Sequence, residues 1–150
     1  MTQLTEHFTL EELTFSQTAT RKGINNEPSE AVKRNLETLA KGLERVRAIL
    51  LSPLHISSGY RSADLNKLIG GSAKSAHMDG YAADFTAPAF GNPEAIVRQL
   101  KRTGIQCDQC ICEGTNSNAW VHISFAPTMR NEFLTAKFVD GKPIYSKYDG

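Results

Sequence analysis

Residues 75–85, SAHMDGYAADF, place a histidine and an aspartate on either side of a glycine. Asp84 lies in the apolar run YAADF, where an isolated ionised carboxylate would be costly to bury. A cation would compensate that charge, and Gly80 lets the backbone turn so that His77 and Asp84 can converge. This segment therefore predicts a metal site whose third protein ligand lies well downstream.

His122 is the candidate for the third ligand, because it lies in the middle of the alternating segment WVHISF, residues 120–125. If Val121 and Ile123 face the core, His122 points to the opposite side, toward a cleft. Two imidazoles and one carboxylate would leave a fourth tetrahedral position for water, as in catalytic rather than closed structural zinc sites. The residues alone leave a second interpretation open, in which the histidine is a hydrogen-bonded structural residue and the aspartate is a cap.

The chain has 150 residues and a formal net charge of +1, which fits one domain over residues 1–150. Lysine and arginine are spread along the sequence rather than clustered, so we expect no nucleic-acid partner. The N-terminus has no basic start followed by an apolar run, and no window reaches the roughly 18 apolar residues of a membrane span. We therefore expect no signal peptide, synthesis in the cytoplasm and no membrane partner.

Hydrophobic periodicity predicts one long helix in the first half of the chain. Pro28 and Ser29 mark its start and Pro53 its end, and a polar loop is expected before it, over residues 18–30. Its apolar residues recur at spacings of three and four and share one face: Val32, Leu36, Leu39, Leu43, Val46 and Leu50. Shorter helical segments are expected at three places: after the capping box at 9–12, from Ser62 to Gly70, and from Asn92 to Gly104.

Strands are expected mainly in the second half of the chain. They are predicted at 54–57, 81–87, 105–113 and 120–125, with a hairpin of 135–139 and 142–146 around Asp140-Gly141. Early helices followed by gathered strands indicate an α+β fold with an antiparallel sheet.

Three segments, SGYRS (58–62), SAHMDGYAADF and WVHISF, closely resemble a zinc peptidase family. That family includes D-alanyl-D-alanine carboxypeptidases and phage L-alanyl-D-glutamate endolysins. Its signature has the form S-x-H-x-x-G-x-A-x-D followed by a W-x-H strand, and five residues match the first part in order and spacing: Ser75, His77, Gly80, Ala82 and Asp84. Residues 7–28 also resemble the opening of phage-encoded members. The resemblance extends to about residue 126 and implies one zinc peptidase-like domain with a hedgehog-like fold, in which helices pack on one side of the sheet.

The resemblance also implies roles for individual residues. Zn²⁺ would be held by His77, Asp84 and His122, and would activate water for peptide hydrolysis. Arg61 matches the family arginine that faces the substrate, where a guanidinium can hold a carboxylate or a developing oxyanion. Ser75 would either hydrogen-bond the substrate or fix the loop before the first histidine.

The general base of the resembled family has no direct counterpart in this sequence. Relatives place an acid three residues before the last histidine, or a histidine nearby, but residue 119 is alanine. Glu113, at the end of the strand predicted at 105–113, is the candidate, since some phage relatives have a glutamate there. Asp108 is the alternative, although strand alternation would put it on the opposite face from Glu113.

The remaining histidines and the cysteines have structural interpretations. Cys107, Cys110 and Cys112 form no second C-x-x-C pair, and the resembled family has aliphatic or aromatic residues in this strand, so small buried side chains are expected. Their odd number and the missing export signal argue against a disulfide framework and favour synthesis in a reducing compartment. His7 precedes a helix cap and His55 lies in a strand distant from the motif.

These features predict a zinc-dependent peptidase that hydrolyses the peptide stems of bacterial peptidoglycan, as an L-Ala-D-Glu endopeptidase or a D-Ala-D-Ala carboxypeptidase. The similarity to phage members suggests a phage or prophage origin, with action on the cell wall after release or as part of a virion, and we expect a monomer. The alternative is a catalytically weak or inactive zinc-containing module that binds the wall or builds the virion. The alanine at position 119 favours that alternative.

Overall fold

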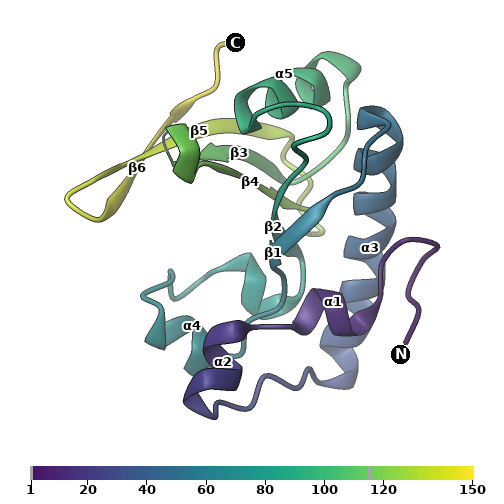
Figure 1. Ribbon diagram of the computed structural model, residues 1–150, viewed down its shortest axis with the longest axis vertical. Helices are drawn as coiled ribbons and strands as arrows, with labels where there is room; N and C mark the ends of the chain where they lie inside the picture. Colours follow the sequence, from purple (N-terminus) through teal and green to yellow (C-terminus); the bar gives the residue numbers. More distant parts are fainter. Residues whose placement is uncertain (1, 115) are drawn as a thin grey trace.

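The long predicted helix is α3 (Glu30–Leu50), which forms one wall of the core (Figure 1). The computed structural model describes residues 2–114 and 116–150. Ser29 caps the helix, because its hydroxyl accepts a hydrogen bond from the backbone N–H of Val32. The apolar face is confirmed, and five of its six residues are fully buried: Leu36, Leu39, Leu43, Val46 and Leu50.

Six strands form a single sheet in the order β1-β2-β4-β3-β5-β6. Their bounds are β1 (His55–Ser58), β2 (Ala82–Thr86), β3 (Gln109–Glu113), β4 (Trp120–Ser124), β5 (Glu132–Val139) and β6 (Lys142–Lys147). The predicted α+β class is confirmed. All neighbouring strands are antiparallel except β3 and β5, which are parallel, so the expected purely antiparallel sheet needs this one correction. The parallel pair arises because the chain leaving β4 crosses to the far side of β3 before β5 begins.

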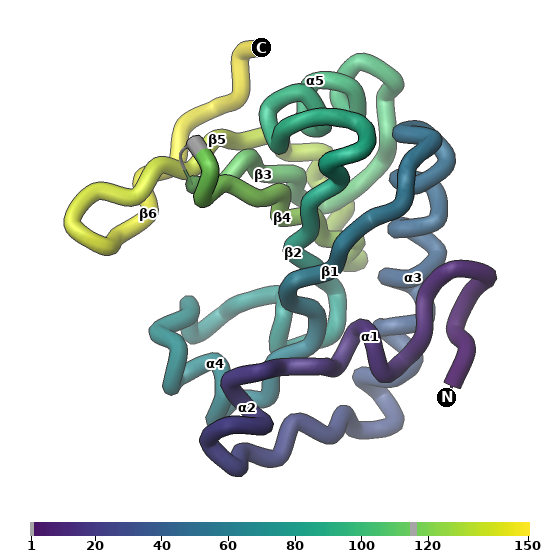
Figure 2. The backbone as a smooth tube through the Cα atoms, viewed as in Figure 1, coloured from purple at the N-terminus to yellow at the C-terminus, as the bar shows by residue number. Residues whose placement is uncertain are grey.

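The two faces of the sheet have different environments. On one face α3 and α5 (Pro93–Thr103) pack over the strands, as the backbone trace shows (Figure 2). Buried residues from α5 and from the strands meet there: Ile96, Val97, Leu100, Ala83, Phe85, Cys110, Val121 and Ile123. Because neighbouring residues of a strand point to opposite faces, Asp84 and His122 lie on the other face. The predicted packing of helices on one side therefore leaves that second face for a site.

Short capped helices lie before and after β1 in the chain. They are α1 (Leu10–Thr14) capped by Thr9, and α4 (Ala63–Leu68) capped by Ser62. Within the polar loop expected at 18–30, the structure instead has α2 (Gln17–Lys22), so the loop prediction is wrong for this part. Ser16 caps α2 and Gly23 ends it in a left-handed conformation, but only Ala19 is buried, which explains the missing apolar periodicity.

The hairpin predicted at Asp140-Gly141 is confirmed as the connection between β5 and β6. Both turn residues have positive φ, 52° and 77°, as a two-residue hairpin turn of the common type requires. Among the described residues, no helix is long and apolar enough to cross a bilayer.

The cysteines behave as the sequence predicts. Cys107 and Cys110 are fully buried, Cys112 is partly buried, and all three are free thiols. Burial raises the pKa of Cys107 to about 12, with a further contribution from the Asp108 carboxylate. A thiol that stays protonated is a poor nucleophile and metal ligand, so these side chains serve the core.

Candidate metal centre

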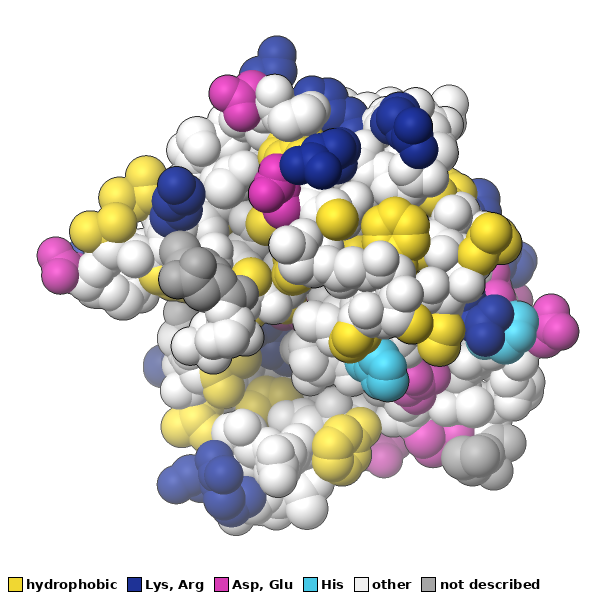
Figure 3. Space-filling view, turned by 45° about the horizontal axis from the view of Figure 1, so that its top comes forward, with side chains coloured by type: hydrophobic (Ala, Val, Ile, Leu, Met, Phe, Trp, Pro, Cys, Tyr) yellow, Lys and Arg dark blue, Asp and Glu magenta, His cyan; other side chains and the backbone are white. Residues whose placement is uncertain are grey.

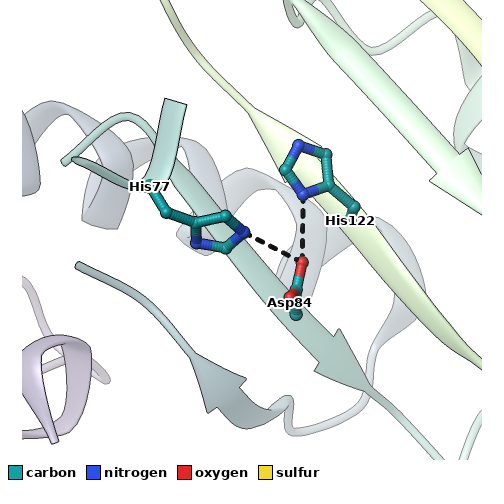
Figure 4. A group of neighbouring side chains, drawn as sticks. All are labelled: His77, Asp84 and His122. Carbon is teal, nitrogen blue, oxygen red and sulfur yellow. Dashed lines mark hydrogen bonds and ion pairs between the residues drawn. The ribbon is translucent and has the colours of Figure 1, made fainter. Parts of the chain in front are cut away.

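The side chains of His77, Asp84 and His122 converge on the open face of the sheet (Figure 4). Nε2 of His77 lies 3.3 Å from Oδ1 of Asp84, and Nδ1 of His122 lies 3.0 Å from the same oxygen. One ligand atom from each residue lies within 4.8 Å of the others. The structure thus brings together the three side chains that the sequence pattern singles out as a set.

The spacing of these atoms fits zinc. Protein ligands lie about 2.0–2.2 Å from Zn²⁺ in tetrahedral sites, so neighbouring ligand atoms are about 3.3–3.6 Å apart. The distances of 3.3 Å and 3.0 Å around Oδ1 of Asp84 are close to that range. Two nitrogens and one carboxylate oxygen are also a ligand set that suits zinc and leaves one position for water.

Backbone structure fixes each ligand. His77 lies in the 3₁₀ helix η1 (Ala76–Asp79), which Gly80 ends with a φ of 77°. A Cβ at residue 80 would crowd Val32 and Leu36 of α3, so glycine is required there for conformation and for space. Asp84 and His122 are direct cross-strand partners in β2 and β4, which places their side chains next to each other.

The carbonyl of Gly59 orients the imidazole of His77. Nδ1 of His77 lies 2.8 Å from this oxygen, and the His77 side chain is only 2% exposed. Because a carbonyl can only accept, Nδ1 carries a proton, so Nε2, which faces Asp84, is the nitrogen that would bind a metal. Metal-binding histidines commonly donate their second N–H in this way, which fixes ring orientation and tautomer.

The electrostatics of the ligand group favour an ionised carboxylate. Burial by itself raises the pKa of Asp84, but His77 and His122 outweigh it, so the pKa lies well below its usual range. Burial also opposes the charged form of His122, yet the hydrogen bond and charge of Asp84 raise the pKa of this imidazole overall. The acid in the apolar run is therefore stabilised as an anion by two adjacent imidazoles, and a cation can take the same role.

Glu113 lies beside the ligands, at the end of β3. Its Oε1 is 4.0 Å from Nδ1 of His122. Burial raises the pKa of Glu113, the neighbouring Asp84 raises it further, and the imidazole of His122 and the guanidinium of Arg61 oppose this shift only in part. A raised pKa makes this carboxylate a stronger base, as the proton acceptor of a hydrolytic reaction requires.

Asp108 occupies a different cluster. Its carboxylate accepts hydrogen bonds from Nε and Nη2 of Arg130 at 2.8 and 2.9 Å, and from the hydroxyl of Thr128 at 2.7 Å. The sequence left both Glu113 and Asp108 as candidates for the general base. Of the two, the structure places Glu113 next to the metal ligands.

Arg61 and Ser75 form the rim next to His77. Nη2 of Arg61 donates to the Ser75 hydroxyl at 3.3 Å, and the backbone N–H of Arg61 donates to the carbonyl of His77 at 3.1 Å. Burial lowers the pKa of Arg61, while the carboxylates of Asp84 and Glu113 oppose that shift, so the guanidinium lies within electrostatic reach of both acids. Its Nε is buried and finds no partner among the described residues.

The Ser75 hydroxyl caps η1 by accepting from the backbone N–H of His77 at 3.2 Å. It thus fixes the loop before the histidine, one of its two predicted roles, and still has its own proton to donate. The substrate-binding role stays a prediction.

Two positioning residues have no signature in the sequence. Asn26 donates from Nδ2 to the carbonyls of Thr14 and Tyr60, and its Oδ1 accepts from the backbone N–H of Ser62, so it holds the segment on both sides of Arg61. Gly59 cannot be replaced easily, because a Cβ there would overlap the carbonyl oxygen of Leu13. Both depend on contacts between segments distant in the chain, which no local pattern reveals.

The two other histidines lie outside the ligand group found among the described residues. His7 pairs with Glu44, through its backbone N–H at 2.7 Å and its Nδ1 at 2.8 Å, and His55 is exposed on β1. Both fit the structural interpretation.

Comparison with known proteins adds one finding. The family model described as Peptidase M15 matches residues 6–124, a range that contains α1 to β4 and every residue of the ligand group. A search of curated proteins gives no match. The matched range is well over half of the 150 residues, and it agrees with the family that the sequence motifs resemble. The chain therefore belongs to the peptidase M15 family, whose members are zinc-dependent peptidases.

Proposed function

We propose that this protein hydrolyses the peptide stems of bacterial peptidoglycan with a zinc ion held by His77, Asp84 and His122. The observation that carries the proposal is the convergence of these three ligands with the Glu113 carboxylate 4.0 Å from His122. A structural zinc site is closed by four protein ligands, whereas only three side chains converge here within the described residues.

Each residue of the site has a distinct task. Zinc, when bound, supplies a Lewis acid that activates water and polarises a peptide carbonyl. Glu113 accepts the proton of the attacking water at its carboxylate and returns it to the leaving amine. Arg61 binds a substrate carboxylate or the developing oxyanion through its guanidinium, which also contacts the Ser75 hydroxyl. The carbonyl of Gly59 keeps the imidazole of His77 in place.

The bond cleaved is proposed to be L-Ala-D-Glu or D-Ala-D-Ala. Both lie in stems rich in free carboxylates, which suit a site that combines zinc with Arg61. The similarity of residues 7–28 to phage-encoded members supports a phage or prophage origin. Such a monomeric enzyme would reach the wall after release from the cell or as part of a virion.

Release of fragments from purified sacculi tests this function. The wild-type protein should release muropeptides, lose this activity on chelation and regain it with added zinc, and mass spectrometry of the fragments identifies the bond. His122→Ala serves as the inactive control. Sacculi that stay intact in the presence of zinc would reject the peptidase.

A zinc-containing wall-binding module is the second candidate, favoured by the alanine at position 119. High-affinity co-sedimentation of the protein with sacculi, without release of fragments, would favour this module over the peptidase. The position of Glu113 argues against it, because a carboxyl group beside the ligands supplies the base that residue 119 lacks.

A further inference from the structure

The β5–β6 hairpin continues the open face of the sheet beyond the site and carries aromatic side chains. Cross-strand register pairs Trp120 with Glu113, Glu113 with Ala136, and Ala136 with Tyr145. Directly paired residues point to the same face, so Tyr145 lies on the face of the metal ligands. Phe138 is two residues from Ala136 on β5 and shares that face. We call Trp120, Phe138 and Tyr145 the aromatic row.

Rings of the aromatic row lie close together and remain partly exposed to solvent. The rings of Trp120 and Phe138 lie 5.9 Å apart with an interplanar angle of 37°. Phe138 is 43% exposed and Tyr145 is 53% exposed, and Trp120 is partly buried beside Glu113, its cross-strand partner. Figure 3 shows the hairpin as a projection with hydrophobic side chains, and the surface below it in this view is hollowed.

Tyr145 lies within electrostatic reach of the site. Burial raises the pKa of its phenol, and the carboxylates of Glu113 and Asp84 raise it further. Since Glu113 and Tyr145 both pair with Ala136, the aromatic row begins next to the site and is close to a ligand bound there. The hairpin also lies beyond residue 124, outside the range matched by the family model, so the row combines one residue inside that range with two outside it.

The chemistry of the row fits a sugar better than a peptide stem. Stem peptides present carboxylates, amides and small side chains, which require charges and hydrogen bonds of the kind that Arg61 and Ser75 offer. Aromatic rings offer flat apolar faces, with a polar edge at the exposed Tyr145, and match the C–H face and hydroxyl rim of a pyranose ring. The stem is joined to the sugar through its L-Ala, so cleavage of the L-Ala-D-Glu bond would bring a pyranose close to the site.

We propose that the aromatic row binds the saccharide to which the peptide stem is attached, and so makes the enzyme select stems still joined to the glycan. This inference rests on the function proposed above for its biological role, but saccharide binding can be measured without catalysis.

Trp120 is the only tryptophan of the chain, so its fluorescence reports on the row directly. The probe is a peptide-free tetrasaccharide of alternating N-acetylglucosamine and N-acetylmuramic acid, titrated into the wild-type protein. We expect a saturable change in emission and about tenfold weaker binding for Tyr145→Ala, as for the loss of one good aromatic contact. Tyr145→Leu, which keeps an apolar side chain on β6, is the second variant should the alanine variant fold poorly.

Ile144→Ala is the matched control, because Ile144 is 56% exposed on the same strand but points to the opposite face. Its affinity should equal that of the wild type. No emission change in the wild type, or equal weakening by Tyr145→Leu and Ile144→Ala, would overturn the inference.

A kinetic comparison separates this inference from the proposed function. The ratio of kcat/KM for a disaccharide-bearing stem to that for the same free peptide should fall about tenfold in Tyr145→Leu, mainly through KM. An unchanged ratio overturns saccharide recognition while leaving the peptidase intact. A wild type that binds the tetrasaccharide but cleaves neither substrate rejects the peptidase and leaves the saccharide site intact.

Discussion

Asp84 and His122 are direct cross-strand partners, and their side chains meet at 3.0 Å between Oδ1 and Nδ1. Two of the three ligands are thus positioned by the register of β2 and β4 rather than by a flexible loop. A shift of one residue in that register would move one ligand to the helix-covered face. The stability of the sheet core therefore protects the geometry of the metal centre.

Removal of either imidazole should abolish metal binding. In His77→Ala or His122→Ala, bound zinc should fall from about one ion per chain to near zero, because two ligands cannot replace a set of three. Hydrolysis should be lost with the metal. Elemental analysis after dialysis measures the zinc, and His55→Ala, which removes an exposed histidine from β1, is the control that should keep it. Full activity without metal in either ligand variant would refute the assignment.

Glu113→Gln should separate chemistry from metal binding. The amide keeps the size of the side chain but cannot accept a proton, so kcat should fall about 10²–10⁴-fold while zinc content stays at the wild-type level. Paired measurements of zinc content and initial rate on a stem peptide test this. A wild-type rate would exclude Glu113 as the general base.

Asn26→Ala should loosen the segment around Arg61. The variant loses hydrogen bonds to the carbonyls of Thr14 and Tyr60 and from the N–H of Ser62, so the free energy of unfolding should fall by about 1–3 kcal/mol. Urea unfolding measures this, and zinc content should not change because no ligand is touched. The neighbouring Asn25 is exposed, so Asn25→Ala should cost clearly less. Equal losses in the two variants would contradict the positioning role.

The Asp108–Arg130 pair should make stability depend on pH. Hydrogen bonds from Arg130, together with that from Thr128, hold the pKa of Asp108 well below its usual range despite its burial. A depressed carboxyl pKa stabilises the fold above the unfolded value of about 4, and this stabilisation is lost as the pH falls below it. Asp108→Asn should therefore lower the free energy of unfolding by about 1–3 kcal/mol at pH 7, and by progressively less below pH 4. This range allows for solvent screening of the ion pair, because Arg130 is half exposed.

Urea unfolding of the wild type and of Asp108→Asn at several pH values checks this dependence. Asp149→Asn, at an exposed position near the C-terminus, is the control that should not follow it. If the free energies of unfolding of Asp108→Asn and the wild type differ by the same amount from pH 7 to pH 3, the result would argue against the ion pair.

Local patterns predicted the elements whose signals are contained within a few residues. The spacing of Leu36, Leu39 and Leu43 reports the buried face of α3, and Asp140-Gly141 reports a hairpin, because each depends on its own backbone periodicity or conformation. The apolar run around Asp84 suggested a metal site but left a structural interpretation open, and the ligand set was predicted only together with the family resemblance.

Features that depend on contacts between distant segments were not predictable. The parallel pairing of β3 with β5 is decided by where the chain passes after β4, which alternation within a strand does not encode. The same holds for the contact of Gly59 with His77 and for the bonds of Asn26, whose polar neighbours suggested only a loop. In α2, capping by Ser16 outweighs a weak apolar pattern.

The attachment of the hairpin has an evolutionary consequence. All three ligands lie on η1, β2 and β4, whereas β5 and β6 are joined to the sheet only across the far side of β3. Mutations or insertions near the Asp140-Gly141 turn of this arm, beyond the pairing of Ala136 with Glu113, can therefore alter the aromatic row while the metal ligands stay in place. Lineages that meet differently decorated cell walls would be expected to diverge fastest in this arm.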